Sequence, residues 1–187
     1  MDNEKEIMTS ISNNDMKALS LLYDRFSEKV YNTALSYTKN IEDAEEITQD
    51  VFVKIYNSAS GFKANATLST WIYRITINTS INYVKKNKRM LQLKNTMEGS
   101  RSVDFQHPGV ILEHKENINT IYKAMDCLPD SQKTVFILSY IEDLPRKKIA
   151  EIMETSLKAV ESLLQRAKKK MQSELEYLYP DRRKSIN

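Results

Sequence analysis

The sequence predicts an all-α protein of two small helical domains joined by a flexible linker. Only 3 of the 187 residues are glycine and 4 are proline, too few for the tight turns that sheets require. Apolar residues recur at steps of three and four over most of the chain, which is the helical period. Residues 92–110 interrupt this pattern with glycine, serine and proline, and a break of this length is typical of a linker between domains.

Three amphipathic helices are predicted in the first domain, which we place at residues 1–91. Each gathers its apolar residues on one stripe, as a helix with one buried face does. Asn14 and Thr67 have side-chain oxygens suited to cap the first and third helices, and Lys39 and Asn40 close the first. The expected ranges are 15–37, 42–57, and 67 to beyond 83.

The linker is placed at residues 92–112 and a second domain at residues 113–187. Prolines and short polar runs mark where one helix stops and the next begins. Only a three-residue turn, 154–156, separates the last two helices, and two helices joined in this way make a helix-turn-helix. The expected ranges are 110–127, 131–141, 146–153 and 157–177.

Charge is distributed unevenly, although the net charge is only +3. Residues 1–60 carry a net charge of −5 and residues 61–101 carry +7. Residues 102–145 carry −4, and residues 146–187 carry +5. Two separate basic blocks suggest two contacts with a polyanion, whereas the acidic blocks suggest surfaces kept away from it. Solvated helix faces with uneven charge are the alternative.

The helix-turn-helix presents a polar outer face. Ser156 can cap its second helix, and Lys147, Lys148 and Lys168 can neutralise phosphates. Such a helix fits the major groove of DNA, where arginine, glutamine and serine read base edges. From this motif alone, an ordinary helical hairpin with a lysine-rich face is an equal alternative. The outward residues are Lys158, Glu161, Ser162, Gln165, Arg166 and Lys169.

Basic and aromatic residues are interleaved on the third helix. This combination suits melted DNA, because rings stack on unpaired bases while cations hold the backbone. Trp71 lies on the inner stripe, so we expect it in the core. The loop before the helix contains Phe62, Lys63 and Asn65, which suit a pocket for a flipped base, although a plain connector is the alternative. The polar helix residues are Arg74, Asn78, Asn82, Lys85, Lys86, Lys88 and Arg89.

An acidic ridge is predicted on the second helix. Its members are Asp43, Glu46, Gln49 and Asp50, which share one side of the helix. Negative charge is unsuited to DNA but suits a basic protein partner. Paired carboxylates also occur in catalytic and metal sites, but the Glu-x-x-His pattern of such helices is absent from the sequence. We therefore expect no catalytic residue and no metal site.

Several other classes of function are not expected. One cysteine, Cys127, excludes an internal disulfide and a cysteine-rich zinc site. Two histidines are too few for most metal or triad chemistry, and no glycine-rich phosphate loop is present. The first residues do not resemble a signal peptide, and no apolar run is long enough for a membrane span. We expect a cytoplasmic protein with neither a cofactor nor a small-molecule substrate.

These features, in this order, resemble a bacterial RNA polymerase sigma factor of the extracytoplasmic-function (ECF) group. The resemblance covers most of both domains. The run Asp-Ala-Glu-Glu-Ile-Thr-Gln-Asp at 43–50, followed by Thr-Trp-Ile-Tyr-Arg-Ile at 70–75, is the most specific part. In the second domain the match runs through Leu-Pro at 128–129, Ile-Ala-Glu-Ile-Met at 149–153, Val-Glu-Ser at 160–162 and Arg-Ala at 166–167.

The resemblance implies a role for each segment. Asp43, Glu46, Gln49 and Asp50 would bind core RNA polymerase. The minus-ten element would be recognised and melted by Phe62, Lys63, Asn65, Arg74, Asn78, Lys85, Lys86 and Arg89. The minus-thirty-five element would be read as duplex by Lys147, Lys148, Ser156, Lys158, Ser162, Gln165, Arg166 and Lys169. Polymerase performs the chemistry, so the chain itself would not be an enzyme, and an anti-sigma factor is an expected partner.

Departures from the family pattern leave the promoter preference open. Lys148 stands where glutamate is frequent, Glu154 where the turn usually has glycine, and Glu161 where a basic residue is common. A stand-alone helix-turn-helix regulator is the alternative function, and it would bind duplex DNA without polymerase. A helical enzyme or scaffold is a third hypothesis, weakened by the lack of any plausible nucleophile or metal cluster.

Overall fold

The computed structural model describes residues 2–95 and 120–178, and every regular element in these ranges is helical. The chain forms two compact units, residues 1–106 and 107–187. The predicted all-α class with two helical domains is therefore confirmed. The predicted linker, 92–112, begins inside a helix that runs to Asn95, because residues 91–94 are good helix formers. The rest of that linker lies outside the described residues.

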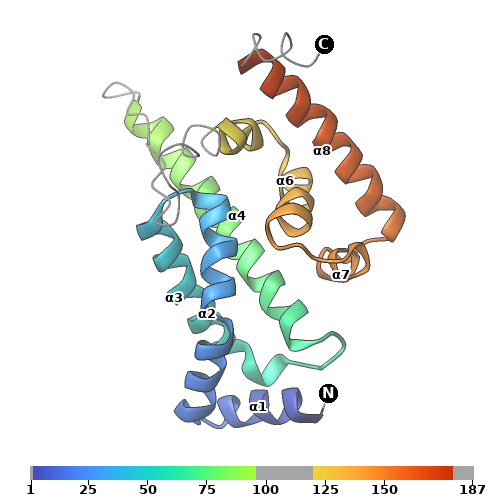
Figure 1. The fold of residues 1–187 in the computed structure, drawn as a ribbon. Helices are drawn as coiled ribbons and strands as arrows, with labels where there is room; N and C mark the ends of the chain where they lie inside the picture. The colour runs from blue at the N-terminus through green and yellow to red at the C-terminus, as the bar shows by residue number, and fades with distance from the viewer. Residues whose placement is uncertain (1, 96–119, 179–187) are drawn as a thin grey trace. The chain divides into compact units, whose positions relative to one another are not determined.

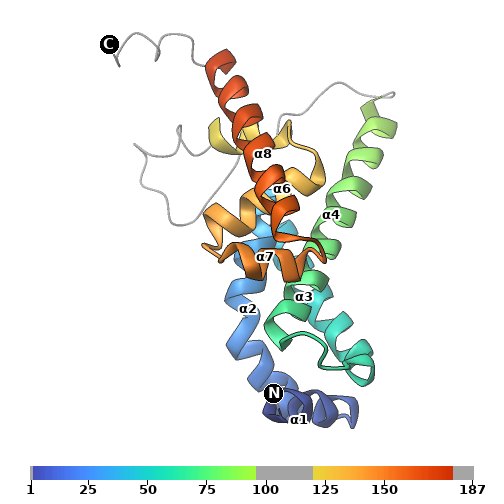
Figure 2. The same cartoon turned by 90° about the vertical axis from the view of Figure 1, so that its right-hand side faces the viewer.

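Three long helices form the body of the first unit (Figure 1): α2 (Met16–Thr38), α3 (Ile41–Ser58) and α4 (Leu68–Asn95). Each packs against the other two, and they lie side by side also in the second view (Figure 2). Their apolar stripes meet in one core, as the helical period predicts. The buried members include Leu22, Phe26, Val30, Ala34, Ala44, Ile47, Val51, Ile55, Leu68 and Ile72.

A further helix, α1 (Asp2–Ser12), lies across one end of this core (Figure 1). This helix was not predicted from the sequence. Met8 and Ile11 are 1% and 0% exposed, so α1 contributes fully to the same core. It contacts α2, α3 and the short turn η1 (Ala59–Gly61), which begins the loop before α4.

The predicted cap of α2 is wrong by one residue. Asp15 is the N-cap, and its carboxylate accepts the N–H groups of Lys17 at 2.9 Å and Ala18 at 3.2 Å. Asn14 has a left-handed backbone, with φ at 66°, and its side-chain oxygen accepts the Tyr56 hydroxyl instead. The turn that places Asn14 in this conformation points its side chain towards α3, so the next oxygen along the chain caps the helix.

The second unit begins, in the described part, with a helical segment at residues 120–126. Its core joins buried residues of every following helix, among them Val135, Leu138, Ile149, Val160 and Leu164. The predicted helix 131–141 departs from α geometry at its end, where residues 137–141 are π-helical. The elements are α6 (Asp130–Phe136), η2 (Ile137–Ile141), α7 (Arg146–Ile152) and α8 (Leu157–Leu178).

The predicted helix-turn-helix is present as α7, a tight turn and α8 (Figure 2). Ser156 caps α8, as predicted, because its hydroxyl oxygen accepts the Ala159 N–H at 3.1 Å. Glu154, in the turn, has φ at 51°, a left-handed conformation that glycine adopts with less strain. The turn is therefore formed at a glutamate that the backbone geometry does not favour.

Replacing this residue by glycine tests the strain. We expect Glu154→Gly to raise the free energy of unfolding by up to about 1 kcal/mol, because the strained conformation is relieved. Urea denaturation of the full chain measures the change. Thr155→Gly is the matched control, since its backbone is not left-handed, and it should give no gain. A loss of stability in Glu154→Gly equal to that in Thr155→Gly would contradict the strain.

Candidate functional surfaces

The acidic ridge lies along the first half of α3. We define it as Asp43, Glu46, Gln49 and Asp50, and the structure brings all four to one side of the helix. The last three are exposed and Asp43 is half-buried. The Asn40 side chain caps α3 by accepting the Asp43 N–H at 2.8 Å. The start of the helix is thereby fixed, and with it the direction of the ridge.

Tyr83 of α4 ties the ridge to the rest of the unit. Its hydroxyl lies 2.8 Å from Asp43 Oδ1 and 2.8 Å from Glu46 Oε2, and it donates its one proton to this pair of carboxylates. Burial, followed by the hydrogen bonds to Glu46 and Asp43, raises the pKa of Tyr83 well above its usual range. The hydroxyl therefore stays protonated and remains a donor under all ordinary conditions.

Sequence reasoning did not predict this role of Tyr83. The hydrogen bonds join residues about forty positions apart, and only the register between α3 and α4 brings them together. A phenol opposite two carboxylates has no local pattern in a single sequence. The signal that was available is weaker: Tyr83 falls on the apolar side of α4 although it carries a polar group.

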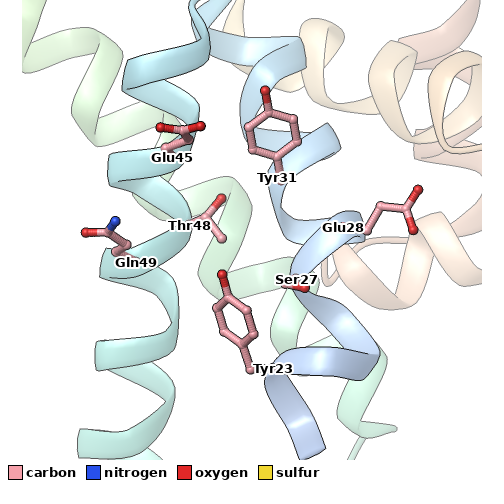
Figure 3. Close-up of a pocket in the computed structure, with 7 residues that line it drawn as sticks. All are labelled: Tyr23, Ser27, Glu28, Tyr31, Glu45, Thr48 and Gln49. Carbon is pink, nitrogen blue, oxygen red and sulfur yellow. The ribbon is translucent and has the colours of Figure 1, made fainter. Parts of the chain in front are cut away.

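A groove of about 380 Å³ lies beside the ridge, between α2 and α3. Figure 3 shows Tyr23 and Tyr31 of α2 and Thr48 of α3 pointing into the space between the helices. Gln49 belongs both to the ridge and to the groove lining, so the two surfaces are continuous. Burial, and to a lesser extent the nearby Glu45 carboxylate, raise the pKa of Tyr31.

The side of α4 opposite Tyr83 carries a basic stripe, which we define as Arg74, Asn78, Lys85 and Arg89. At 100° per residue, its members fall within about 60° of one another around the helix and extend over about 22 Å. Asn78, Lys85 and Arg89 are exposed, whereas Arg74 is half-buried. Lys86 is exposed but lies to one side of the stripe.

The loop before α4 presents two of its three predicted contacts. Lys63 and Asn65 are exposed, but Phe62 is only 9% exposed and belongs to the core. Its ring packs edge-on against Trp71 with the ring centres 5.4 Å apart. The apolar ring gains more from this core than from solvent, so it anchors the loop in the core. Trp71 is half-buried against the core, in keeping with its expected place there.

The outer face of α8 carries a second basic surface. Lys158, Ser162, Gln165 and Lys169 are exposed and fall within about 60° around the helix, with Arg166 beside them. On α7, Lys147 is exposed, whereas Lys148 is half-buried and lies 3.7 Å from Glu151. The structure therefore brings the predicted residues of α8 together on one face.

Two contacts position the side chains on this face. Arg166 reaches back along its own helix, with Nη2 donating to Ser162 Oγ at 3.2 Å and Nε to the Ser162 carbonyl at 3.3 Å. Arg146 of α7 pairs with Glu161 of α8 at 3.4 Å. Both side chains of this pair are largely exposed, so the bridge adds little stability. Its effect is to pair the Glu161 carboxylate with a cation, which lowers the negative potential of this face.

Within the described residues, no group of three or more metal-ligating side chains is found, and no helix is long and apolar enough to cross a membrane. The surfaces that do occur are an acidic one suited to a basic protein and two basic ones suited to nucleic acid. This combination is typical of a helical protein that binds both nucleic acid and a protein partner.

Comparison with known families gives the same division. The family described as Sigma-70 region 2 matches residues 22–90, and that described as Sigma-70, region 4 matches residues 118–171. The first match contains the acidic ridge and the basic stripe, and the second contains the helix-turn-helix. The chain belongs to the sigma-70 family of RNA polymerase sigma factors, in its ECF group.

Individual relatives support this assignment. The chain is 31% identical to the RNA polymerase sigma factor SigV of Bacillus subtilis, over 78% of this chain and 83% of that protein. It is 28% identical to the ECF RNA polymerase sigma factor SigW of the same organism, over 91% and 96% of the two chains. The solved structure of CnrH in complex with the cytosolic domain of CnrY shares the fold, with a TM-score of 0.67 at 18% identity over 93% and 97% of the two chains.

As a sigma factor of this group, the protein binds core RNA polymerase, directs it to promoters and helps to melt DNA for initiation. The stand-alone regulator is not favoured, because the matches cover both sigma regions.

The role of Tyr83 leads to a pH-dependent prediction. Tyr83→Phe leaves the two ridge carboxylates without their shared donor, so we expect the free energy of unfolding to fall by about 1–2 kcal/mol at neutral pH. The folded-state pKa lies above the ordinary value, so this stabilisation is fully present below about pH 10 and declines as the pH rises further.

Urea denaturation of the wild type and Tyr83→Phe at a series of pH values measures the difference. The difference should shrink above about pH 10 as the unfolded-state phenol ionises. Tyr177→Phe is the matched control, because Tyr177 is 82% exposed, and it should change stability little at any pH. A Tyr83 effect that is constant across the series would contradict the role of the hydroxyl.

Proposed function

We propose that the three surfaces divide the work of initiation. In this proposal the acidic ridge contacts core polymerase, and the basic stripe with Lys63 and Asn65 holds the melted minus-ten element. The outer face of α8, with Lys147 and Lys148 of α7, reads the minus-thirty-five element as duplex. Polymerase supplies the chemistry, so we propose no catalytic residue and no cofactor in this chain.

One observation carries the proposal for the first unit. Tyr83 and the basic stripe lie on opposite sides of α4, and Tyr83 faces the ridge carboxylates at 2.8 Å. A polyanion on the stripe and a basic protein on the ridge therefore approach from different directions. The two partners can therefore bind at the same time, as they must on a factor that joins polymerase to DNA.

The proposal for the second unit rests on the exposed polar face of α8. The contact with Ser162 holds Arg166 along the helix, which restricts the side chain before DNA arrives. Arginine in the major groove makes two parallel hydrogen bonds to guanine. Glu161 is paired with Arg146, so its carboxylate is less free to accept from a cytosine amino group than the sequence alone indicates.

We also propose an anti-sigma partner in the cytoplasm. Two solved structures that share the fold contain partners: CnrH with the cytosolic domain of CnrY, and the sigma factor RpoE of Bartonella quintana with the anti-sigma factor NepR. The second has a TM-score of 0.64 at 19% identity, over 86% of this chain and 98% of that chain. A pull-down from the native cell tests this proposal, and recovery of polymerase with no inhibitor under any growth condition would contradict it.

Charge reversal on the ridge tests the polymerase surface. We expect Asp50→Lys to weaken the binding of core polymerase by about tenfold or more, because a cation then faces a basic partner. Binding of the chain to duplex DNA that carries only the minus-thirty-five element should be unchanged. Fluorescence anisotropy measures both affinities. Glu6→Lys on α1 changes the charge of the same unit equally and should have little effect, whereas equal losses in both assays for Asp50→Lys would contradict the assignment.

Arg166→Ala tests base reading by α8. We expect promoter binding by the holoenzyme to weaken by about 1–3 kcal/mol, and the loss to disappear on templates in which one minus-thirty-five base pair is changed. Run-off transcription on a set of upstream variants measures this. Lys168→Ala is the matched control, because it also removes one positive charge from α8. Lys168 Nζ lies over the Tyr140 ring, 5.3 Å from its centre, so we expect this variant to leave the sequence preference unchanged. A uniform loss for Arg166→Ala would make it a phosphate contact.

A further inference from the structure

We propose that α1, through Glu4, is a positioning element for the loop that precedes α4, and so acts on promoter melting. This inference rests on the proposed function of Lys63 and Asn65 in that loop. Glu4 Oε2 accepts the backbone N–H of Leu68, the first residue of α4, at 3.1 Å. The family match begins at residue 22, so α1 lies outside it.

The hydrogen bond from Leu68 fills a gap in the capping of α4. The first turn of any helix has N–H groups without partners inside the helix. Thr67 accepts the N–H of Thr70 through its hydroxyl at 3.2 Å, and does not serve Leu68. Leu68 is 0% exposed, so solvent is a poor substitute acceptor. A carboxylate at this position also interacts favourably with the helix dipole.

The rest of α1 holds Glu4 in place. Met8 and Ile11 are buried in the core, and α1 contacts η1, where the loop starts. Asn14, just beyond α1, accepts the Tyr56 hydroxyl from the last part of α3 at 2.6 Å. The α1 segment is thus joined to the helix before the loop and to the helix after it.

The loop itself has a conformation that needs such support. Ala64, between Lys63 and Asn65, has φ at 54°, which is strained for a residue with a β-carbon. Strained backbone persists only where the surroundings hold it. Phe62 fixes one side of Ala64 in the core, and the Glu4 contact fixes the start of α4 on the other. Lys63 and Asn65 are therefore presented in one arrangement before DNA binds.

A fixed loop affects the melting of the promoter more than the initial binding of duplex promoter DNA. Extruding a base from a duplex has an energetic cost, and binding in a preformed pocket offsets more of this cost than binding to a loop that must first become ordered. Without the Glu4 contact, the loop has to become ordered in the same step in which the base is extruded. Templates in which the minus-ten region is already unpaired avoid most of the difficulty, because the base no longer has to be extruded from a duplex.

The test compares Glu4→Ala with the wild type in the full chain bound to core polymerase. We expect run-off transcription from a duplex promoter to fall about three- to tenfold, and transcription from the same promoter with a premelted minus-ten bubble to stay within about twofold. Glu4→Gln keeps an acceptor oxygen and should recover part of the activity. Glu6→Ala, exposed on the same helix, is the matched control and should behave as wild type.

A second measurement reports on the loop directly. Trypsin cleaves mobile loops faster than ordered ones, so the rate of the cut after Lys63 should rise in Glu4→Ala and not in Glu6→Ala. The inference is overturned if Glu4→Ala leaves the cut and duplex transcription unchanged, or if duplex and bubble templates lose activity equally. A loss of core polymerase binding in Glu4→Ala as large as its loss of duplex transcription would overturn the inference as well.

Two further variants separate this inference from the proposed function. Lys63→Ala and Asn65→Ala should both lower duplex transcription if the loop contacts the minus-ten element. If they do and Glu4→Ala does not, only the role of α1 fails. If neither variant has an effect, the loop assignment itself is wrong, and with it the inference that depends on it.

Discussion

The packing of α4 against α3 is the interaction on which the first unit depends. It buries the apolar faces of both helices and turns Tyr83 towards Asp43 and Glu46. A second link, from Lys54 Nζ to Thr79 Oγ1 at 3.0 Å, joins the same two helices. Because one face of α4 is committed to α3, its basic stripe has to point elsewhere. The separation of acidic and basic surfaces thus follows from the core.

Departures from the family pattern in the second unit have structural counterparts. Glu161, where a basic residue is common, is paired with Arg146 of the preceding helix. Lys148, where glutamate is frequent, lies near Glu151 one turn along α7. Glu154 forms the left-handed turn residue where glycine is usual. The first two changes are therefore paired locally, whereas Glu154 forms the turn at the cost of a strained backbone.

Much of this architecture could be predicted from the sequence. The ranges of α2, α3, α7 and α8 follow from helical periodicity, because each helix has one apolar stripe that packs on the core of its own unit. The cap at Ser156 follows from its place before such a stripe. The shared face of the acidic ridge follows from spacing alone. These features depend on neighbours within a few residues, which a single sequence displays.

Other features could not be predicted because they depend on contacts between distant segments. The α1 helix has few apolar residues, and Met8 and Ile11 reveal their role only when α1 meets the core. Phe62 was expected to face DNA, but a partner ring in Trp71 holds it in the core. Tyr83 became a partner of the ridge only through the register of α3 and α4. In each case a residue adjacent in space, not in sequence, decided the outcome.

We propose that the acidic ridge and the basic stripe of the first unit contact different partners at the same time. Site-specific photocrosslinkers placed at Asp50 and at Asn78, in the complete complex with polymerase and promoter, test it most directly. We expect Asp50 to crosslink to a polymerase subunit and Asn78 to promoter DNA within one assembly. Crosslinks from Asp50 to DNA, or from both positions to the same partner, would contradict it.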